Sequence, residues 1–327
     1  MAPPTLSENL DNLYTSTWQN MKSQVGDNIF AATPFWFWLQ KGGGIENVEG
    51  GRFLTEPLRY AKSDNVAWVQ KGSTVSLAEK EFITVAKYDW RYLVDSVVRF
   101  GVDDQQNRGK NLIINLMNAK LQNAQDTLVD TLETALAGTV ATSGAITGMT
   151  GLQRAVPDDP TAATAYGGLD PSSYTWWRNQ ATNMTGESFA AYGLTRMRTM
   201  YNNCMNNLGM DRPNILVSGQ TPYEYYEDEV EEQKRIVNKV LGDAGFENIQ
   251  YKGVPMVWSP AIAATRMYFL NTKFIKLKRD PMLNFDMTAW KDIPNQVNDR
   301  VAQIIIALEL CVSRRRCQGV IYNIDTV

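Results

Sequence analysis

One long amphipathic segment, residues 103–137, constrains the possible folds of this chain more than any other feature. Asp103 and Asp104 stand at its start, where acidic side chains stabilise a helix N-terminus, and Gly138 follows its end, where helices commonly stop. Such a helix is about 50 Å long and about three times the average length. With one apolar stripe, it is expected to lie across a sheet in a flat plate. Its apolar residues recur mainly every four positions, at Leu112, Leu116, Ala119, Leu121, Ala124, Leu128, Leu132 and Leu136.

The sequence before this helix predicts a long hairpin. Residues 52–60 (RFLTEPLRY) and 81–94 (EFITVAKYDWRYLV) have strand-like alternation, and a polar, turn-prone stretch joins them. A two-stranded ribbon alone is marginal in water, so the hairpin is expected to lie against another subunit. The joining stretch holds one apolar knot, Val66, Trp68 and Val69. We expect these three side chains to anchor the tip on a neighbour; packing on their own domain is the alternative.

Four consecutive aromatic residues precede the hairpin, and they cannot all face one side of a strand or helix. One interpretation is a buried strand covered on both faces. The other is an arm whose aromatic side chains anchor on a neighbouring subunit, because Trp and Phe dominate interface anchors. The glycines of residues 42–51 match no phosphate-binding motif and indicate hinges or strand breaks. The aromatic residues are Phe35, Trp36, Phe37 and Trp38.

After the long helix, residues 138–187 are rich in small and turn-forming residues and indicate a long irregular stretch. Residues 188–280 then alternate helical and strand patterns, which predicts a small layered α/β unit. The chain closes with strands over residues 297–327, with a hairpin corner expected at the basic run Arg314, Arg315 and Arg316.

Composition excludes several classes of function. The chain has no histidine, so imidazole serves neither as a base nor as a metal ligand. The cysteines Cys204, Cys311 and Cys317 fit no disulfide or zinc pattern and are expected to be buried apolar groups. With 32 basic and 35 acidic residues, the chain lacks the cationic excess of a nucleic-acid binder. No signal peptide and no membrane-length apolar run is present, which predicts a soluble protein made in a reducing cytoplasm.

Several short motifs occur in a particular order. They are residues 166–170 (YGGLD), 176–179 (WWRN), 251–255 (YKGVP), 267–271 (MYFLN) and 302–324 (AQIIIALELCVSRRRCQGVIYNI). Each is weak alone. Together with the order of arm, hairpin, long helix, α/β unit and returning strands, they resemble the tailed-bacteriophage major capsid proteins of the Hong Kong-ninety-seven fold.

This resemblance implies an α+β capsid fold. It implies an N-terminal arm, an extended hairpin called the E-loop that overlaps the neighbouring subunit, and a peripheral domain with a long spine helix. An α/β axial domain would pack around the centre of each ring. The corresponding segments are 1–49 for the arm, 50–92 for the E-loop, 93–184 and 291–327 for the peripheral domain with spine helix 103–137, and 185–290 for the axial domain.

The resemblance also implies a structural role and not an enzyme, without catalytic residues, cofactor or metal. Copies of the chain would assemble in the host cytoplasm into rings of five and six and into an icosahedral virion shell. The shell would enclose phage DNA without sequence-specific binding and without a membrane. Because only a short arm without heptads precedes the hairpin, either a separate scaffolding protein is expected or a helical scaffolding region has been cleaved; the separate protein is the first expectation. Portal and decoration proteins are the further partners.

Two sets of basic residues acquire a role under this resemblance. Lys62 and Lys71 lie near the expected hairpin tip and are candidate inter-subunit contacts. Some capsid proteins crosslink such a lysine to a neighbour's asparagine, but no spacing here shows a partner, so no crosslink is predicted. For Arg314, Arg315 and Arg316 a solvated turn is the first interpretation, and a contact with DNA phosphate inside the shell is the second.

Three other classes of function remain open from the residues. A carboxylate-based α/β hydrolytic enzyme could use the acidic run 224–232, and hydrolysis of a glycoside would reveal it. A nucleotide-binding protein could use the strand 214–219 and the helix starting at Thr221, although it lacks a glycine-rich fingerprint. A thermal shift with ATP or NAD would reveal this. Another phage structural protein, such as a tail-tube or decoration protein, would usually be smaller and mostly β.

Overall fold

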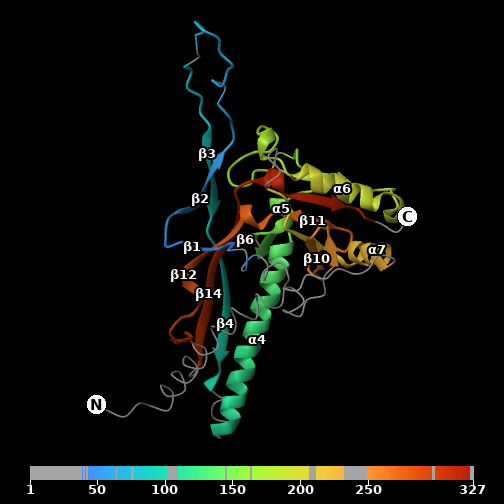
Figure 1. Ribbon diagram of the computed structural model, residues 1–327. Helices are drawn as coiled ribbons and strands as arrows, with labels where there is room; N and C mark the ends of the chain where they lie inside the picture. Colours follow the sequence, from blue (N-terminus) through green and yellow to red (C-terminus); the bar gives the residue numbers. More distant parts are fainter. Residues whose placement is uncertain are drawn as a thin grey trace.

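The structure is a computed structural model. It describes residues 39, 41, 43–63, 65–74, 77–101, 110–143, 146–162, 164–205, 211–231, 249–296 and 299–324. Two sheets and one long helix form the body, and a thin hairpin projects from one end of it (Figure 1). The molecule is therefore elongated, with a large surface for its mass.

The five-stranded sheet is built around its longest strands. Strand β14 pairs antiparallel with β12 on one side and with β4 on the other, and β1 extends the sheet by pairing parallel with β12. The short strand β13 continues the β12 side. The strands are β1 (Ile45–Asn47), β4 (Arg91–Arg99), β12 (Ile275–Met287), β13 (Lys291–Asp292) and β14 (Arg300–Val312).

Helix α4 (Lys110–Ala137) runs along this sheet (Figure 1). Its buried side chains repeat every three or four residues and join the main core. The helix ends directly before Gly138, as the sequence predicts. The predicted start at residue 103 lies outside the described residues, as do the side chains of Leu112, Leu116 and Ala119. The buried residues are Leu121, Ala124, Leu128, Leu132, Ala135 and Leu136.

The predicted hairpin is confirmed. Strands β2 (Phe53–Arg59) and β3 (Ile83–Asp89) pair antiparallel along their whole length. Side chains alternate, so that Leu54, Glu56 and Leu58 are buried while their neighbours on β2 are exposed. Strand β3 leads through a single residue into β4 of the five-stranded sheet. Strands β2 and β3 form the root of the hairpin. One face of this hairpin root is packed on the body of its own chain.

The six-stranded sheet has the order β7-β15-β11-β8-β10-β9 and mixes parallel and antiparallel pairs. One face, including Leu216 and Phe269, packs with α6 and α7, while the other, including Val217 and Tyr268, joins the core shared with α4. The predicted mixture of helices and strands over residues 188–280 is present, but β7 and β15 join the sheet from outside that range and β12 belongs to the five-stranded sheet. The elements are β7 (Gln180–Asn183), η2 (Phe189–Gly193), α6 (Leu194–Asn203), β8 (Ile215–Ser218), α7 (Gln220–Glu231), β9 (Ile249–Tyr251), β10 (Val254–Trp258), β11 (Met267–Leu270), η3 (Thr272–Phe274) and β15 (Gly319–Tyr322).

Two expectations from the sequence are wrong. The stretch 138–187 is not irregular throughout, because β5 (Val140–Ser143) and β6 (Ile146–Thr150) form a second hairpin. After it come the short helix α5 (Leu152–Ala155) and the 3-10 turn η1 (Thr175–Trp177). The closing strands do not form a hairpin either: β14 belongs to the five-stranded sheet, β15 to the six-stranded one, and the 3-10 turn η4 (Arg315–Cys317) crosses between them.

The three cysteines are buried and free, as the sequence predicts. Burial raises the pKa of the Cys204 and Cys311 thiols far above its ordinary value, so both are inert apolar groups. Within the described part of the chain, no helix is both long and apolar enough to cross a membrane.

Candidate inter-subunit contact site

The hairpin root rests on the motif at residues 166–170. Tyr166 and Leu169 bond to each other across a tight turn, in which Gly167 and Gly168 have φ angles of 62° and 73°. A Cβ on Gly167 would lie 2.9 Å from the ring of Tyr88, and the carbonyl of Gly167 accepts a hydrogen bond from the Lys87 amide at 3.0 Å. Glycine is therefore needed here both for the left-handed backbone and for the close approach to β3.

A cluster of buried aromatic residues lies under this turn. The hydroxyl of Tyr88 donates to the Val312 carbonyl, and that of Tyr166 donates to the Leu310 carbonyl, each at 2.8 Å. The Trp177 indole N–H donates to the carbonyl of Tyr166 at 3.0 Å. These bonds tie the hairpin root and the 166–177 segment to strand β14, so the polar atoms of these three aromatic side chains each have a partner.

Arg315 lies in the same cluster, where its exposed fraction is only 1%. Its guanidinium stacks near the rings of Tyr166 and Trp177, at 5.3 and 5.7 Å, and its Nε donates to the carbonyl of Ala155 at 2.8 Å. Burial lowers the pKa of Arg315 to about 10, so the group still carries its charge at neutral pH. The prediction that Arg315 faces DNA is corrected, because its charge is enclosed by its own chain.

The other two arginines of the run differ from Arg315. Arg314 pairs with Asp211 at 3.1 Å and lies 5.1 Å from the ring centre of Phe274, while Arg316 is exposed. The run is thus neither a hairpin corner nor a uniform basic patch. A phosphate contact by Arg314 or Arg316 stays a prediction.

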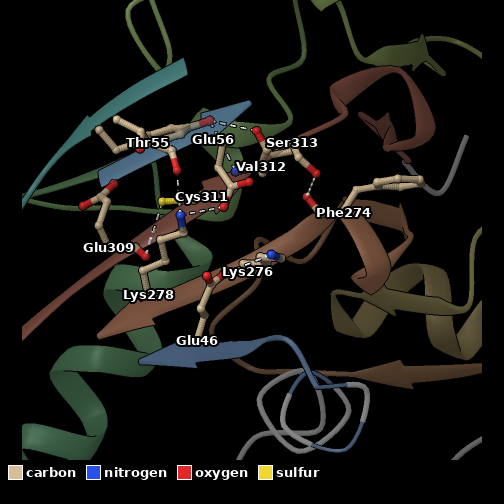
Figure 2. A network of polar contacts seen from close by, with 11 residues as sticks. Glu46, Thr55, Glu56, Phe274, Lys276, Lys278, Glu309, Cys311, Val312 and Ser313 are labelled. Atoms are coloured by element: carbon tan, nitrogen blue, oxygen red, sulfur yellow. Dashed lines mark hydrogen bonds and ion pairs between the residues drawn. The ribbon is translucent and has the colours of Figure 1, made fainter. Parts of the chain in front are cut away.

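A buried ion pair fastens β2 to β12 (Figure 2). The Lys278 ammonium lies 2.7 Å from the Glu56 carboxylate and donates to the carbonyl of Thr55 at 2.8 Å. Both charged side chains are almost completely buried. The approach to Glu56 Oε1 is an ion pair without hydrogen-bond alignment, so the attraction is mainly electrostatic. At the edge of the network, Lys276 pairs with Glu46 at 2.9 Å in a half-exposed site.

The far end of the hairpin has the opposite character. Val66 is 87% exposed and Trp68 is fully exposed, with Val69 exposed beside them. A bond from the Asn65 side-chain amide to the carbonyl of Ala78 at 2.7 Å joins the two sides of the hairpin near this end. The apolar knot therefore has no cover from the described part of its own chain. Lys62 and Lys71 are also exposed near this tip.

The structure adds exposed apolar residues that the sequence argument missed. Five of them occupy the outward face of β2, β3 and β4, where every second side chain points away from the body, while Leu77 and Phe82 lie in the stretch that joins β2 to β3. The alternation that marks the strands would have identified the five, since several side chains opposite the buried face are also apolar. The exposed apolar residues are Phe53, Leu77, Phe82, Ile83, Val85, Tyr92 and Val94.

The remaining candidates from the sequence are the aromatic run and the acidic run. Phe35, Trp36, Phe37 and Trp38 lie outside the described residues. Glu224, in the acidic run, accepts a bond from the Gln220 amide at 2.7 Å on the exposed side of α7. Among the described residues, no group of three His, Cys, Asp or Glu side chains could hold a metal ion.

Comparisons with known proteins place these features in a known architecture. Neither protein-family models nor curated proteins match the sequence. Among solved structures, the capsid asymmetric unit of cyanophage A-1(L) matches with 17% identity over 86% of this chain and 90% of that chain, with a TM-score of 0.63.

Two further structures match. The capsid of Myoviridae phage XM1 has 10% identity over 86% of this chain and 90% of that chain, with a TM-score of 0.54. The holo-SrpI encapsulin complex from Synechococcus elongatus has 12% identity over 90% and 89%, with a TM-score of 0.51. At such identities the likeness concerns the fold, and this chain has the fold that these phage capsid and encapsulin structures share.

Proposed function

We propose that this chain is the major capsid protein of a tailed bacteriophage, which assembles into rings of five and six and then into an icosahedral shell around DNA. The observation that carries the proposal is the projecting hairpin, whose root is locked to its own body while its apolar tip is exposed. Monomeric proteins rarely expose such apolar surface unless another molecule covers it. The similarity in fold to phage capsid proteins supports a role as a shell subunit.

Within this proposal, the segments take the roles that the resemblance implies. Residues 1–49 are the arm, 50–92 the E-loop, and 185–290 the axial domain. The peripheral domain comprises 93–184 and 291–327, with the spine helix ending at Ala137. The two proposed domains share a sheet, because β7 and β15 of the peripheral segments pair within the six-stranded sheet.

The proposed assembly mechanism uses non-covalent contacts alone. In a ring, one surface of a subunit meets a different surface of the next, so each contact is heterologous. Trp68 on the tip would bury roughly 150–250 Å² against its neighbour. Each contact can be weak, because a subunit makes several of them at once and the shell is stabilised multivalently.

The proposed partners follow the same logic. Copies of the chain are the main partner, with a separate scaffolding protein, a portal and decoration proteins as further ones. A net charge of -3 suits a protein that surrounds DNA without sequence-specific binding. No crosslink through Lys62 or Lys71 is proposed.

Two observations weigh against the enzyme alternatives. Glu224 is exposed to solvent and bonded within α7, as expected of a solvated helix face. The hollow at the start of α7, where a nucleotide phosphate would bind, is lined by Gln220 and residues 258–264, and none of these described lining residues is cationic. A phosphate there would lack the charged partner that usually neutralises it.

Analytical ultracentrifugation of the full chain over a concentration series tests the proposal. Rings or shell-sized particles should grow in as concentration rises, and electron microscopy should show their symmetry. A chain that stays monomeric at every concentration, and also when it is co-expressed with a scaffolding protein, would contradict the capsid role.

A further inference from the structure

Three segments meet where the chain passes between the two sheets, and they are bonded to one another. The side-chain amide of Asn214 donates to the Thr272 hydroxyl at 2.7 Å, and its oxygen accepts from the Thr272 backbone amide at 3.0 Å. The Ser313 amide donates to the carbonyl of Phe274 at 2.9 Å. The segment before β8, the β11–β12 connection and the β14–β15 connection are therefore held together.

Basic side chains gather on these segments. Asp211 pairs with Lys273 at 2.9 Å and with Arg314 at 3.1 Å, and both cations remain partly exposed. Arg212 and Arg316, their neighbours in the sequence, are exposed, and no hydrogen bond or ion pair involves the side chain of either in the described part of the chain. We call these four cations and the carboxylate of Asp211 the basic junction.

The basic junction carries an excess of positive charge. Burial raises the pKa of the Cys317 thiol, while the charges of Arg314 and Arg316 lower it, so these two cations act on one point. Cations gathered in this way repel each other, and further anions between them would relieve the repulsion. Asp211 is the only acidic residue in the three segments and the strands beside them, which span residues 211–218, 270–279 and 312–319.

Helix α7 carries the opposite charge. Residues 213–233 contain no Lys or Arg, and the carboxylates of Glu224, Asp228 and Glu229 form no ion pair with any described residue. Glu224 and Asp228 are exposed and stand four residues apart, so they lie on one face of the helix and repel each other. A single copy of the chain leaves this acidic face unbalanced.

The acidic face and the basic junction lie at different ends of the six-stranded sheet. The basic junction precedes the first residue of β8, and α7 begins beyond the last residue of that strand. Figure 1 shows α7 on the side of the molecule away from β12 and β14. Among the described residues, no ion pair joins the two charged surfaces, so they are available to other molecules.

We propose that the acidic face of α7 in one subunit binds the basic junction of the next copy in a ring. The contact rests on the proposed function and names one pair of surfaces in it. Two different surfaces of the same chain meet, which is the head-to-tail arrangement that closes a ring. Asp211 holds Lys273 and Arg314 in place, while Arg212 and Arg316 supply the unpaired cations.

Charge complementarity favours a second copy over DNA as the occupant of the basic junction. DNA phosphate would neutralise the cations but leave the acidic face of α7 unbalanced. Another copy balances both surfaces at once, in equal numbers. Complementary charges of this kind steer the encounter and fix which surfaces meet, while the apolar hairpin tip supplies buried area elsewhere in the contact.

Charge reversal in the full chain tests the contact. Arg316→Glu and Asp228→Lys should each weaken ring formation about tenfold in sedimentation velocity, because like charges would then face each other. Both positions are exposed, so the melting temperature of the subunit should not change. The double variant Arg316→Glu/Asp228→Lys restores opposite charges across every contact and should form rings as wild type does.

Lys291→Glu is the matched control, since it makes the same change in net charge at an exposed position of the other sheet and should leave ring formation unchanged. If a reversed variant misfolds, the neutral variants Arg316→Gln and Asp228→Asn replace it, and each should weaken rings by a smaller factor.

Wild-type rings that neither reversal weakens would overturn this contact alone. A double variant as defective as both single ones would overturn it too. Rings of Arg316→Glu that form normally but lose retention of double-stranded DNA on a filter would assign the basic junction to phosphate instead. A wild-type chain that never associates would overturn the proposed function, and the contact with it.

Discussion

At the scale of single residues, buried charged and polar side chains hold the hairpin root on the body of the chain. Lys278 and Glu56 neutralise each other in a buried site, while Tyr88 and Tyr166 give their hydroxyl protons to carbonyls of β14. An intact buried pair of this kind contributes little to the free energy of folding. Removal of one partner lowers stability strongly, because the other partner is left buried and unpaired. The angle of the hairpin against the body is thus set by directional contacts on one face.

Replacing Lys278 by Met should therefore destabilise the subunit by roughly 3–5 kcal/mol, since the Glu56 carboxylate would remain buried without its cation. Urea denaturation at neutral pH measures the loss. The double variant Glu56→Met/Lys278→Met should recover most of it, because an apolar pair of similar volume avoids the cost of desolvation. A double variant as unstable as Lys278→Met alone would show that packing and not charge sets the cost.

At the scale of elements, the long helix and the first hairpin could be predicted because each carries a local periodicity: four-residue spacing in α4, and alternation in β2 and β3. Residues 138–150 could not, because Thr, Gly and Ala of β5 and β6 mimic a loop. The separation of β14 from β15 depends on pairing with strands far away in the sequence, which no local pattern encodes.

The same distinction applies to the candidate site. The exposed tip residues Val66, Trp68 and Val69 stood out as an apolar knot in a polar stretch. The burial of Arg315 could not be foreseen, because a basic triplet commonly indicates a solvated turn, and only the fold brings its middle member against the rings of Tyr166 and Trp177.

Helix α4 provides the prediction at this scale. Leu128→Ala should destabilise the subunit by about 2–5 kcal/mol, because Leu128 is buried between the helix and the sheet and its removal leaves a cavity. Gln122→Ala, at an exposed position of the same helix, should change stability by less than about 0.5 kcal/mol. Thermal unfolding monitored by circular dichroism compares the two, and equal effects would contradict the packing of this face.

At the scale of the whole molecule, the shape is elongated and the apolar tip of the hairpin is exposed. We therefore expect the stability of the subunit and its assembly to depend on different residues. The exposed residues Val66, Trp68 and Val69 of the tip contribute nothing to the buried core of the described chain, and under the proposed function they act through contacts with other copies. A substitution there should change the shell without changing the subunit.

Trp68→Ala should accordingly weaken assembled shells while the melting temperature of the isolated subunit stays within error of wild type, since the side chain is fully exposed. Gln70→Ala, at an exposed polar position of the same tip, is the control. Shell dissociation on heating, followed by light scattering, measures the effect. Shells of Trp68→Ala that resist heat as well as wild type would rule out the anchor.

The crossing from β14 to β15 also has a consequence for biosynthesis. The five-stranded sheet lacks its central strand, and the six-stranded sheet lacks the strand between β7 and β11, until residues 300–322 have left the ribosome. Because both sheets need these residues, neither sheet can be completed in a nascent chain that stops before them. Such a chain carries the exposed apolar tip of its hairpin on an unfinished body, so we expect it to depend on protection from aggregation until β14 and β15 have been inserted.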